Sequence, residues 1–263
     1  MTHASTRPLA LVTGASSGIG LELARQFTTH GFDVVVTAED DIVTATAELA
    51  VDGAAVIPVK ADLEVPGGAE TVLEAVAATG RPLAAAALNA GFANGGRFVD
   101  IPLADEVRLI AVNITAPVHF AKRLLPAMIE RGEGRILFTS SVAATMPGPY
   151  YATYAASKAF VQSFAEAVRH EVKDTGVTVT ALLPGPTDTD FFEAADMLDT
   201  PVGKAKKDDP ADVAKDGFEA LMAGKDSVIA GSLKNRAQVV GGAVLPDAAK
   251  AKMHAGMTKP EGV

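Results

Sequence analysis

Short apolar runs alternate with longer amphipathic segments along this chain, and this alternation limits the possible folds more than any other feature. The apolar runs are residues 9–13, 33–37, 54–59, 83–88, 135–139, 177–183 and 227–230. Helical periodicity marks residues 19–29, 42–50, 68–78, 105–130, 151–174 and 210–222. Strands that are apolar throughout are typical of a parallel sheet with helices on both faces. With right-handed crossovers, the pattern predicts a doubly wound α/β fold of about seven strands.

Length and segmentation predict a single domain. The 263 residues are a common length for one α/β domain, and no Ser/Gly linker or internal repeat divides them. We expect one domain over residues 1–263, with its core at residues 9–231. Residues 188–209 interrupt the alternation, with an apolar part followed by a charged part. This segment is a lid with an apolar inner side or a long surface loop, and its place after a strand's C-terminal end favours the lid.

Charge and cysteine content exclude several classes of function. A formal net charge of -9 disfavours nucleic acids and anionic membranes as partners. The chain has no cysteine, which excludes disulfides, thiol catalysis and thiolate metal sites. Its five histidines form no cluster with ligand spacing, so we expect no metal site. No apolar run reaches membrane-spanning length and the N-terminal residues lack the apolar core of a signal peptide, so we expect a cytoplasmic location.

A glycine-rich turn follows the first predicted strand and precedes the first predicted helix. Residues 13–20 read TGASSGIG. Glycines permit a tight turn and let a pyrophosphate approach the backbone, and the helix offers free N–H groups and a positive dipole end to phosphates. Many tight turns of this kind bind nothing, but this one has the context that dinucleotide binding requires. The sequence therefore predicts a Rossmann-type nucleotide site.

All three tyrosines lie within five residues: Tyr150, Tyr151 and Tyr154. Lys158 follows Tyr154 by one helical turn, so both side chains lie on one face of a helix. An adjacent ammonium favours the phenolate and lowers the pKa of the phenol, which can then exchange a proton with an alcohol or carbonyl near neutral pH. Alone, such a pair is more often an ordinary helix residue beside a solvated lysine. The glycine turn favours the chemical interpretation.

Further motifs follow in a fixed order, each on the expected element. Asn89-Ala90-Gly91 follows the fourth strand, Asn113 lies in the long helix, Ser141 follows the fifth strand, and Pro184-Gly185 with Thr189 follow the sixth. With the glycine turn and Tyr154-x3-Lys158, they resemble the motifs of short-chain dehydrogenases/reductases of the shorter, single-domain branch. The resemblance runs from Leu9 to about Ala230. Leu88 stands where the family often has a second Asn, and it simply continues the strand.

The resemblance implies a role for each polar residue of the proposed centre. Tyr154 would be the acid/base, and Lys158 would lower its pKa and hydrogen-bond the nicotinamide ribose. Ser141 would hold the substrate oxygen, with Ser140 as the close competitor. Asn113 would support a water that passes the proton onward from Lys158, or it is a buried helix Asn that bonds to backbone.

The same resemblance implies a set of cofactor-binding residues. Asp62 would contact the adenine, or else cap a helix or turn. Thr189 would bind the carboxamide, and Thr187 could substitute for it. The full set is Gly14, Ser16, Ser17, Gly18, Ile19, Gly20, Glu39, Asp62, Leu63, Asn89, Ala90, Gly91, Tyr154, Lys158, Pro184, Gly185, Thr187 and Thr189.

The residues after the second strand bear on the choice of nicotinamide cofactor. An Asp at the position of Ala38 usually marks NAD in the family, and an Arg at the position of Glu39 usually marks NADP. This chain has neither. Glu39 and Asp40 would repel a 2′-phosphate, whereas a carboxylate accepts from the ribose 2′-OH. We predict NAD, with NADP as the alternative; the two acids could also simply begin the next helix.

Aromatic and apolar residues near the proposed centre predict the class of substrate. Such a wall favours an apolar or aromatic alcohol or ketone over a charged metabolite, although Met146 and Phe191 fit core packing equally well. We predict an NAD(P)-dependent oxidoreductase that interconverts an alcohol and a ketone or aldehyde. The alternative is a non-catalytic dinucleotide-binding redox sensor. The expected pocket residues are Val142, Met146, Tyr150, Tyr151, Phe191 and Phe192, with Met197 beside them.

Two expectations concern assembly and the C-terminal tail. By the resemblance, a homodimer or homotetramer would form through the two long helices, residues 105–130 and 151–174. The tail, residues 233–263, is assigned no role. Residues 238–244 could pack against a neighbour, or the last turn frays.

Overall fold

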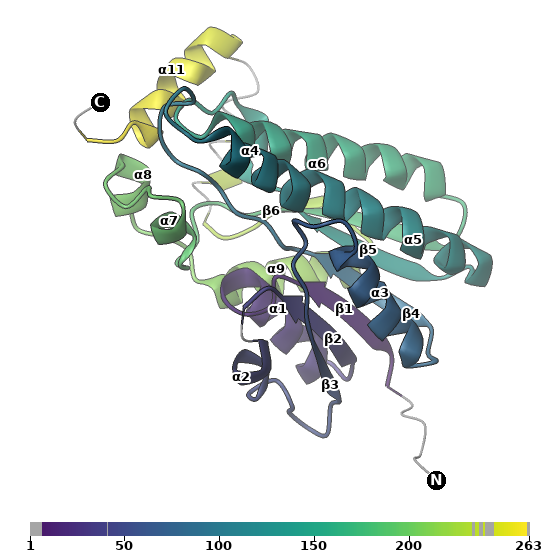
Figure 1. Ribbon diagram of the computed structural model, residues 1–263. Helices are drawn as coiled ribbons and strands as arrows, with labels where there is room; N and C mark the ends of the chain where they lie inside the picture. Colours follow the sequence, from purple (N-terminus) through teal and green to yellow (C-terminus); the bar gives the residue numbers. More distant parts are fainter. Residues whose placement is uncertain (1–6, 41, 233–234, 237–238, 240–244, 262–263) are drawn as a thin grey trace.

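The computed structural model describes residues 7–40, 42–232, 235–236, 239 and 245–261. Seven strands form one parallel sheet in the order β3-β2-β1-β4-β5-β6-β7 (Figure 1). This arrangement confirms the doubly wound α/β prediction. The strands are β1 (Leu9–Thr13), β2 (Asp33–Ala38), β3 (Val56–Lys60), β4 (Leu83–Leu88), β5 (Gly134–Thr139), β6 (Val177–Leu183) and β7 (Ser227–Ile229).

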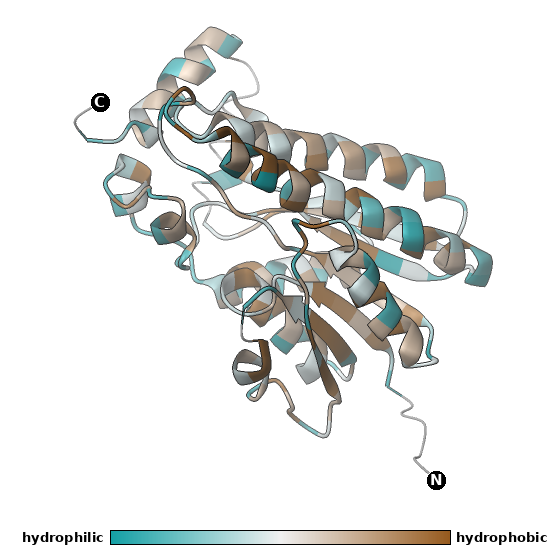
Figure 2. Cartoon of the chain, in the orientation of Figure 1, coloured by the Kyte–Doolittle hydropathy of each residue, from teal (hydrophilic) through white to brown (hydrophobic). Residues whose placement is uncertain are grey.

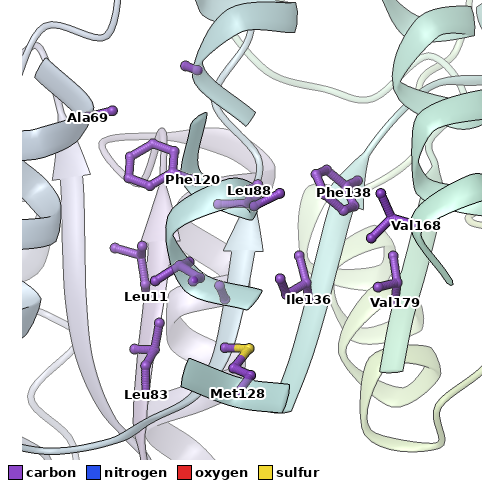
Figure 3. Close-up of a cluster of buried hydrophobic side chains, with 14 of the residues drawn as sticks. Leu11, Ala69, Leu83, Leu88, Phe120, Met128, Ile136, Phe138, Val168 and Val179 are labelled. Carbon is purple, nitrogen blue, oxygen red and sulfur yellow. The ribbon is translucent and has the colours of Figure 1, made fainter. Parts of the chain in front are cut away.

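Helices cover both faces of the sheet. Side chains alternate along β1, so that Leu9 and Leu11 belong to one buried cluster and Ala10 and Val12 to the other. The first cluster lies beneath α3, α5 and α6, and Figure 3 shows Phe120 of α5 beside the strand residues. The second lies beneath α1 and α9. The long helices are α1 (Gly18–Thr29), α3 (Gly68–Ala78), α5 (Ala116–Arg131), α6 (Ala152–Val172) and α9 (Pro210–Met222).

Hydropathy follows this layering. Figure 2 shows brown, hydrophobic residues along the central strands and teal residues toward solvent on the helices. Among the described residues, no helix combines the length and the apolar character needed to cross a bilayer.

Two helical segments differ from the expectation. The helix predicted over residues 42–50 is only α2 (Ile42–Thr46). Thr46 donates its hydroxyl to the carbonyl of Val43 at 3.0 Å, and such back-bonding with β-branched residues weakens a helix. The segment predicted at residues 105–130 is α4 (Leu103–Ile110), a π-helical turn (Ala111–Thr115) and α5.

The π-helical turn ends two residues before Pro117, which lies in the first turn of α5. Proline donates no backbone hydrogen bond, and the wider turn absorbs that loss without ending the helix. Pro126 lies inside α5. The turn also carries Asn113.

The segment 188–209 is a compact loop with two short helices, α7 (Phe191–Ala194) and α8 (Pro201–Lys204). Its ends are joined, because Asp188 N donates to Asp208 O and Asp208 N to Pro186 O, both at 2.8 Å. Phe192 and Met197 are buried against Tyr151 and Tyr154. The segment therefore has the apolar inner side that the lid prediction requires.

The C-terminal tail forms a helix, α11 (Asp247–Thr258), which lies beside α8 (Figure 1). No role was assigned to this tail from the sequence, and in the structure α11 reaches the cavity described below. The expectation for residues 238–244 falls, apart from residue 239, outside the described part of the chain.

Candidate active site

The carboxyl ends of β1 and β4 meet at the centre of the sheet, where the direction of the crossovers reverses. Open α/β sheets bind ligands in the crevice at this point. A cavity of about 440 Å³ lies there. The predicted residues that line it are Gly14, Ser16, Ser17, Gly18, Ile19, Gly20, Asn89, Ala90, Gly91, Ser141, Val142, Tyr151, Tyr154, Lys158, Pro184, Gly185, Thr187, Thr189, Phe191 and Phe192.

The glycine turn requires its glycines. Gly14 and Gly18 have φ values of +67° and +54°, in the left-handed region that side chains disfavour. A Cβ on Gly20 would lie 1.9 Å from the carbonyl oxygen of Gly14. Ser17, the N-cap of α1, makes no side-chain cap to any described residue. The first N–H groups of α1 therefore lie beside the cavity without a side-chain acceptor, which suits a phosphate.

Hydrogen bonds join the ends of the central strands. Thr13 Oγ1 accepts from the backbone N–H groups of Asn89 and Ala90 at 2.9 and 3.0 Å. Thr139 Oγ1 donates to Asn89 Oδ1 at 3.1 Å. A side chain on β1, one after β4 and one on β5 thus fix one another. This fixed edge positions the glycine turn relative to the residues after β5.

Tyr154 and Lys158 lie on the cavity side of α6 and are both buried. The ammonium of Lys158 lies 5.7 Å from the centroid of the Tyr154 ring. It donates to the carbonyl oxygen of Thr139 at 2.9 Å. Tyr154 and Lys158 therefore lie on one face of α6, as their spacing in the sequence predicts.

The pKa of Tyr154 corrects a sequence-based prediction. An adjacent ammonium was expected to lower it, but burial raises the pKa of Tyr154 to about 12, against a smaller lowering by its hydrogen bond with Ser141. Burial lowers the pKa of Lys158 to about 8. The reason is that removal from water disfavours the charged form of each group. The sequence reveals the neighbouring charge but not the depth of burial.

The two adjacent serines have different partners. Ser140 Oγ donates to the carbonyl oxygen of Lys158 at 2.9 Å, within α6. Ser141 Oγ donates to Pro184 O at 3.5 Å and accepts from Ala143 N at 3.1 Å, and its interaction with Tyr154 lowers the pKa of the phenol. Ser140 therefore holds the strand end against the helix, and Ser141 is the serine that meets the phenol.

Asn113 does not line the cavity, but it supports the residues behind it. Its Nδ2 donates to Phe92 O at 2.9 Å and to Ser157 Oγ at 3.0 Å, and its Oδ1 accepts from Phe92 N at 3.1 Å. A Cβ on Gly91 would lie 3.0 Å from both Asn113 Oδ1 and Lys158 Nζ. These two polar atoms therefore flank Gly91, which leaves no space for a side chain.

Three predicted cofactor residues, Glu39, Asp62 and Leu63, do not line the cavity; Asp40 does. The carboxylates of Glu39, Asp62 and Glu64 lie within 4.8 Å of one another. The pKa of Glu39 is raised, by burial first and then by its acidic neighbours. Asp62 Oδ1 accepts from Glu64 N at 2.8 Å, so it serves as the turn cap that was the structural alternative. This edge of the cleft is acidic.

Aromatic rings form one side of the cavity. Tyr151 stacks on Tyr154 with centroids 5.5 Å apart, and Phe191 packs on Tyr154 at 5.3 Å. Met146 and Tyr150, both expected here, are not among the described residues that line the cavity. Met146 is buried in the packing, which was the alternative considered for it. Tyr150 has a φ of +65°, and its carbonyl accepts from Gly96 N at 2.8 Å.

Sequence reasoning missed the contribution of α11. His254, Met257 and Thr258 line the cavity. They lie about a hundred residues from the tyrosines, and no motif or periodicity marks them. No signal in the sequence would have found them, because their role depends on where the tail packs.

Comparison with known proteins points to the family that the sequence motifs resemble. A family model described as short chain dehydrogenase matches residues 8–197. A short chain dehydrogenase from Pseudocercospora fijiensis is 34% identical over 195 residues, which cover 73% of this chain and 63% of that protein. This chain therefore spans less than two thirds of the fungal relative. The oxidoreductase YbbO of Escherichia coli is 34% identical over 203 residues, 73% of this chain and 74% of YbbO.

A solved structure has the same fold over most of both chains. The short-chain dehydrogenase from Sphingobium yanoikuyae, in complex with NADPH, superposes with a TM-score of 0.78 at 29% identity. The match covers 84% of this chain and 87% of that one.

Proposed function

The chain belongs to the short-chain dehydrogenase family, and from this premise we propose that it interconverts an alcohol and a ketone or aldehyde with a nicotinamide dinucleotide. The observation that carries the proposal is a buried Tyr154 at the cavity wall, which it lines together with Ser141 and with Lys158, one helical turn away. A sensor that only bound the dinucleotide would not need this arrangement.

The residues of the cleft fit a dinucleotide. Gly14, Gly18 and Gly20 permit a tight turn that has no room for a Cβ, a turn of the kind that lets a pyrophosphate approach the backbone. The N-terminus of α1 lies beside the cavity. A bound nicotinamide would supply or accept the hydride. Thr189, which a Cβ on Gly18 would meet at 2.8 Å, closes the turn from the other side and is proposed to bind the carboxamide.

Proton exchange is the part assigned to this chain's own residues. Ser141 would hold the substrate oxygen, and Tyr154 would give it a proton or take one from it. With its pKa raised to about 12, the phenol carries its proton at neutral pH and is ready to donate it. Lys158 would stabilise the phenolate that results. Asn113 is proposed to support the water that passes the proton onward.

The acidic edge of the cleft supports NAD as the cofactor. Glu39 lies with Asp62 and Glu64, and these carboxylates would repel the 2′-phosphate of NADP. Arg108 is paired with Glu64, so it neutralises part of this charge without removing it. Steady-state kinetics with NADH and NADPH test the proposal, and a strong preference for NADPH, the cofactor in the Sphingobium structure, would contradict it.

The aromatic wall supports an apolar or aromatic substrate. Tyr151, Phe191 and Phe192 present ring surface to the cavity, and such a lining favours apolar ligands oriented by a few polar groups. A panel of aliphatic, aromatic and charged ketones, assayed with both cofactors, tests this assignment.

The test of the catalytic proposal is Tyr154→Phe, which keeps the ring and removes the hydroxyl. We expect turnover to be lost while nucleotide binding is retained. Ser141→Ala and Ser140→Ala form a matched pair, and only Ser141→Ala should raise the barrier to turnover. Retention of most activity in Tyr154→Phe would refute the proposal. Tight nucleotide binding with no turnover on any carbonyl in the wild type would indicate the sensor instead.

An apolar stripe supports assembly into a homodimer or homotetramer. Leu103, Val107 and Ile110 follow one face of α4 and are 77%, 55% and 41% exposed, and Phe160 of α6 is 41% exposed. Figure 1 shows α4 and α5 end to end, in a long helical run that lies beside α6 on one face of the sheet. Burial of such a stripe against a second copy is favourable. Light scattering on the wild type and on Leu103→Glu would test this, with dissociation expected in the variant.

A further inference from the structure

The helix α11 brings His254 to Tyr151, next to the proposed catalytic residue. The hydroxyl of Tyr151 and Nε2 of His254 form a hydrogen bond, and Nδ1 of His254 lies 2.9 Å from the carbonyl oxygen of Pro147. A carbonyl oxygen only accepts, so Nδ1 carries the hydrogen. In the neutral ring Nε2 is then the acceptor, and Tyr151 donates to it.

The ring of Tyr151 is confined on three sides. One face stacks on Tyr154 at an interplanar angle of 21°. A Cβ on Gly148 would lie 2.9 Å from Cε1 of Tyr151, so the loop backbone lies close against this ring. The third constraint is the bond from the hydroxyl to His254. Both residues are buried, Tyr151 at 7% and His254 at 3% exposed.

A second contact ties α11 to the same loop without involving Tyr151. Thr258 Oγ1 donates to the carbonyl oxygen of Pro149 at 2.8 Å. The loop 147–149 is therefore held by two residues of α11, and only one of them also reaches Tyr151. This division makes it possible to separate the anchoring of the helix from an effect on the ring.

We propose that His254 is a positioning residue for the substrate side of the active site, which acts through Tyr151. Its hydrogen bond fixes the ring that packs on Tyr154, so that the cavity wall is rigid where a substrate must lie beside the phenol. The kinetic part of this inference rests on the proposed oxidoreductase function. The structural part, that α11 holds the ring of Tyr151 in place, does not depend on that function.

The first test uses tyrosine fluorescence, which needs no turnover. The chain has three tyrosines and no tryptophan, so its emission comes from residues 150–154 alone. A phenol bonded to an imidazole acceptor loses excitation by proton transfer, and its emission is weak. His254→Asn keeps an N–H for Pro147 but removes the acceptor, so emission should rise. His254→Gln keeps a hydrogen-bond acceptor for Tyr151, but an amide oxygen does not take the proton, so its emission should rise as in His254→Asn while its substrate KM stays near that of the wild type.

The matched control for fluorescence is the Tyr151→Phe background. There His254→Asn should leave the emission unchanged, because the affected fluorophore is gone. Unchanged emission in His254→Asn with Tyr151 present, or an equal rise in both backgrounds, would overturn the inference.

The second test is a double-mutant cycle on the kinetics. His254→Asn and Tyr151→Phe should each raise the substrate KM about fivefold, the size expected for one neutral hydrogen bond. The double variant should be no worse than either single variant, because both remove the same bond. Nucleotide affinity should be unchanged, since the bond from His254 reaches Tyr151 and not the glycine turn.

Thr258→Val separates positioning from anchoring. It removes the bond to Pro149 but not the bond to Tyr151, so it should leave the tyrosine fluorescence near that of the wild type. If Thr258→Val reproduces the rise in fluorescence of His254→Asn, the role of His254 is only to anchor α11, and the inference is wrong. If the wild type turns over no substrate, the proposed function fails, and the fluorescence comparison alone decides the inference.

Discussion

Replacement of Lys158 by methionine should stabilise the free protein at neutral pH while it abolishes turnover. Lys158 is 4% exposed, and burial lowers the pKa of its ammonium from 10.5 to about 8. This change means that the folded state penalises the charged form by about 3 kcal/mol. Methionine has a similar length and no charge, so it avoids this penalty.

The net gain is smaller than the penalty, because the lysine also makes one hydrogen bond. Its ammonium donates to the carbonyl oxygen of Thr139, and an unsatisfied carbonyl costs about 1 kcal/mol. We therefore expect Lys158→Met to raise the free energy of unfolding by about 2 kcal/mol at pH 7.

The sign of the pH dependence follows from proton linkage. Below about pH 8 the lysine is charged in both the folded and the unfolded chain, so the wild type carries the whole penalty. Between about pH 8 and pH 10.5 the folded protein releases the proton that the unfolded chain still binds, so wild-type stability rises. The advantage of the variant should shrink through this range and become a deficit of about 1 kcal/mol, from Thr139, at its upper end.

Urea titrations of nucleotide-free protein, from about pH 6 to about pH 10, measure this difference. Lys122→Met is the matched control, because Lys122 is exposed on α5. Its effect on the free energy of unfolding should be small and should not change with pH. A difference between Lys158→Met and wild type that stays constant across the range, or a less stable variant at pH 7, would refute the reasoning.

Three further predictions concern other parts of the molecule. Gly20→Ala places a Cβ 1.9 Å from Gly14 O, so calorimetry should show nucleotide affinity at least about tenfold weaker, a loss of about 1.4 kcal/mol; unchanged affinity would disprove the role of the turn. Asp33 is 1% exposed and accepts a hydrogen bond from Arg81 at 2.8 Å. Asp33→Ala should therefore lower the free energy of unfolding, measured by urea titration, by about 3 kcal/mol. An unchanged free energy of unfolding would show that this ion pair does not stabilise the fold. Glu39→Gln should raise the ratio of kcat/KM with NADPH to kcat/KM with NADH by about fivefold, because it relieves about 1 kcal/mol of repulsion of the 2′-phosphate. An unchanged ratio would show that Glu39 does not select the cofactor.

The sheet was the most predictable part of the fold. The runs at 9–13, 83–88 and 177–183 match β1, β4 and β6 to the residue, because a strand buried on both faces must be apolar along its whole length. The helix at 42–50 was overestimated because its threonines compete for backbone hydrogen bonds, an effect that periodicity does not report.

Some residues of the candidate site could likewise be placed from the sequence, and others required the structure. The glycine turn and the residues after β4, β5 and β6 could be placed from the sequence, because parallel strands bring their carboxyl ends to one edge. The serine that meets Tyr154 was indicated only by spacing, and the partners of Ser140 and Ser141 required the structure. His254 could not be found at all, since its contact with Tyr151 depends on how a distant helix packs.

The burial of Tyr154 and Lys158, which the sequence did not reveal, also explains why the two are placed together. Burial raises the pKa of the phenol from 10.0 to about 12, a cost of about 3 kcal/mol for forming the phenolate. An ammonium 5.7 Å from the ring centroid attracts that anion by about 3 kcal/mol at an effective dielectric constant of about 20. In bulk water the same attraction would fall below about 1 kcal/mol. Burying Lys158 costs stability, but the buried ammonium attracts the phenolate by about as much as burial of the phenol disfavours it. An exposed lysine would attract the phenolate too weakly to do so.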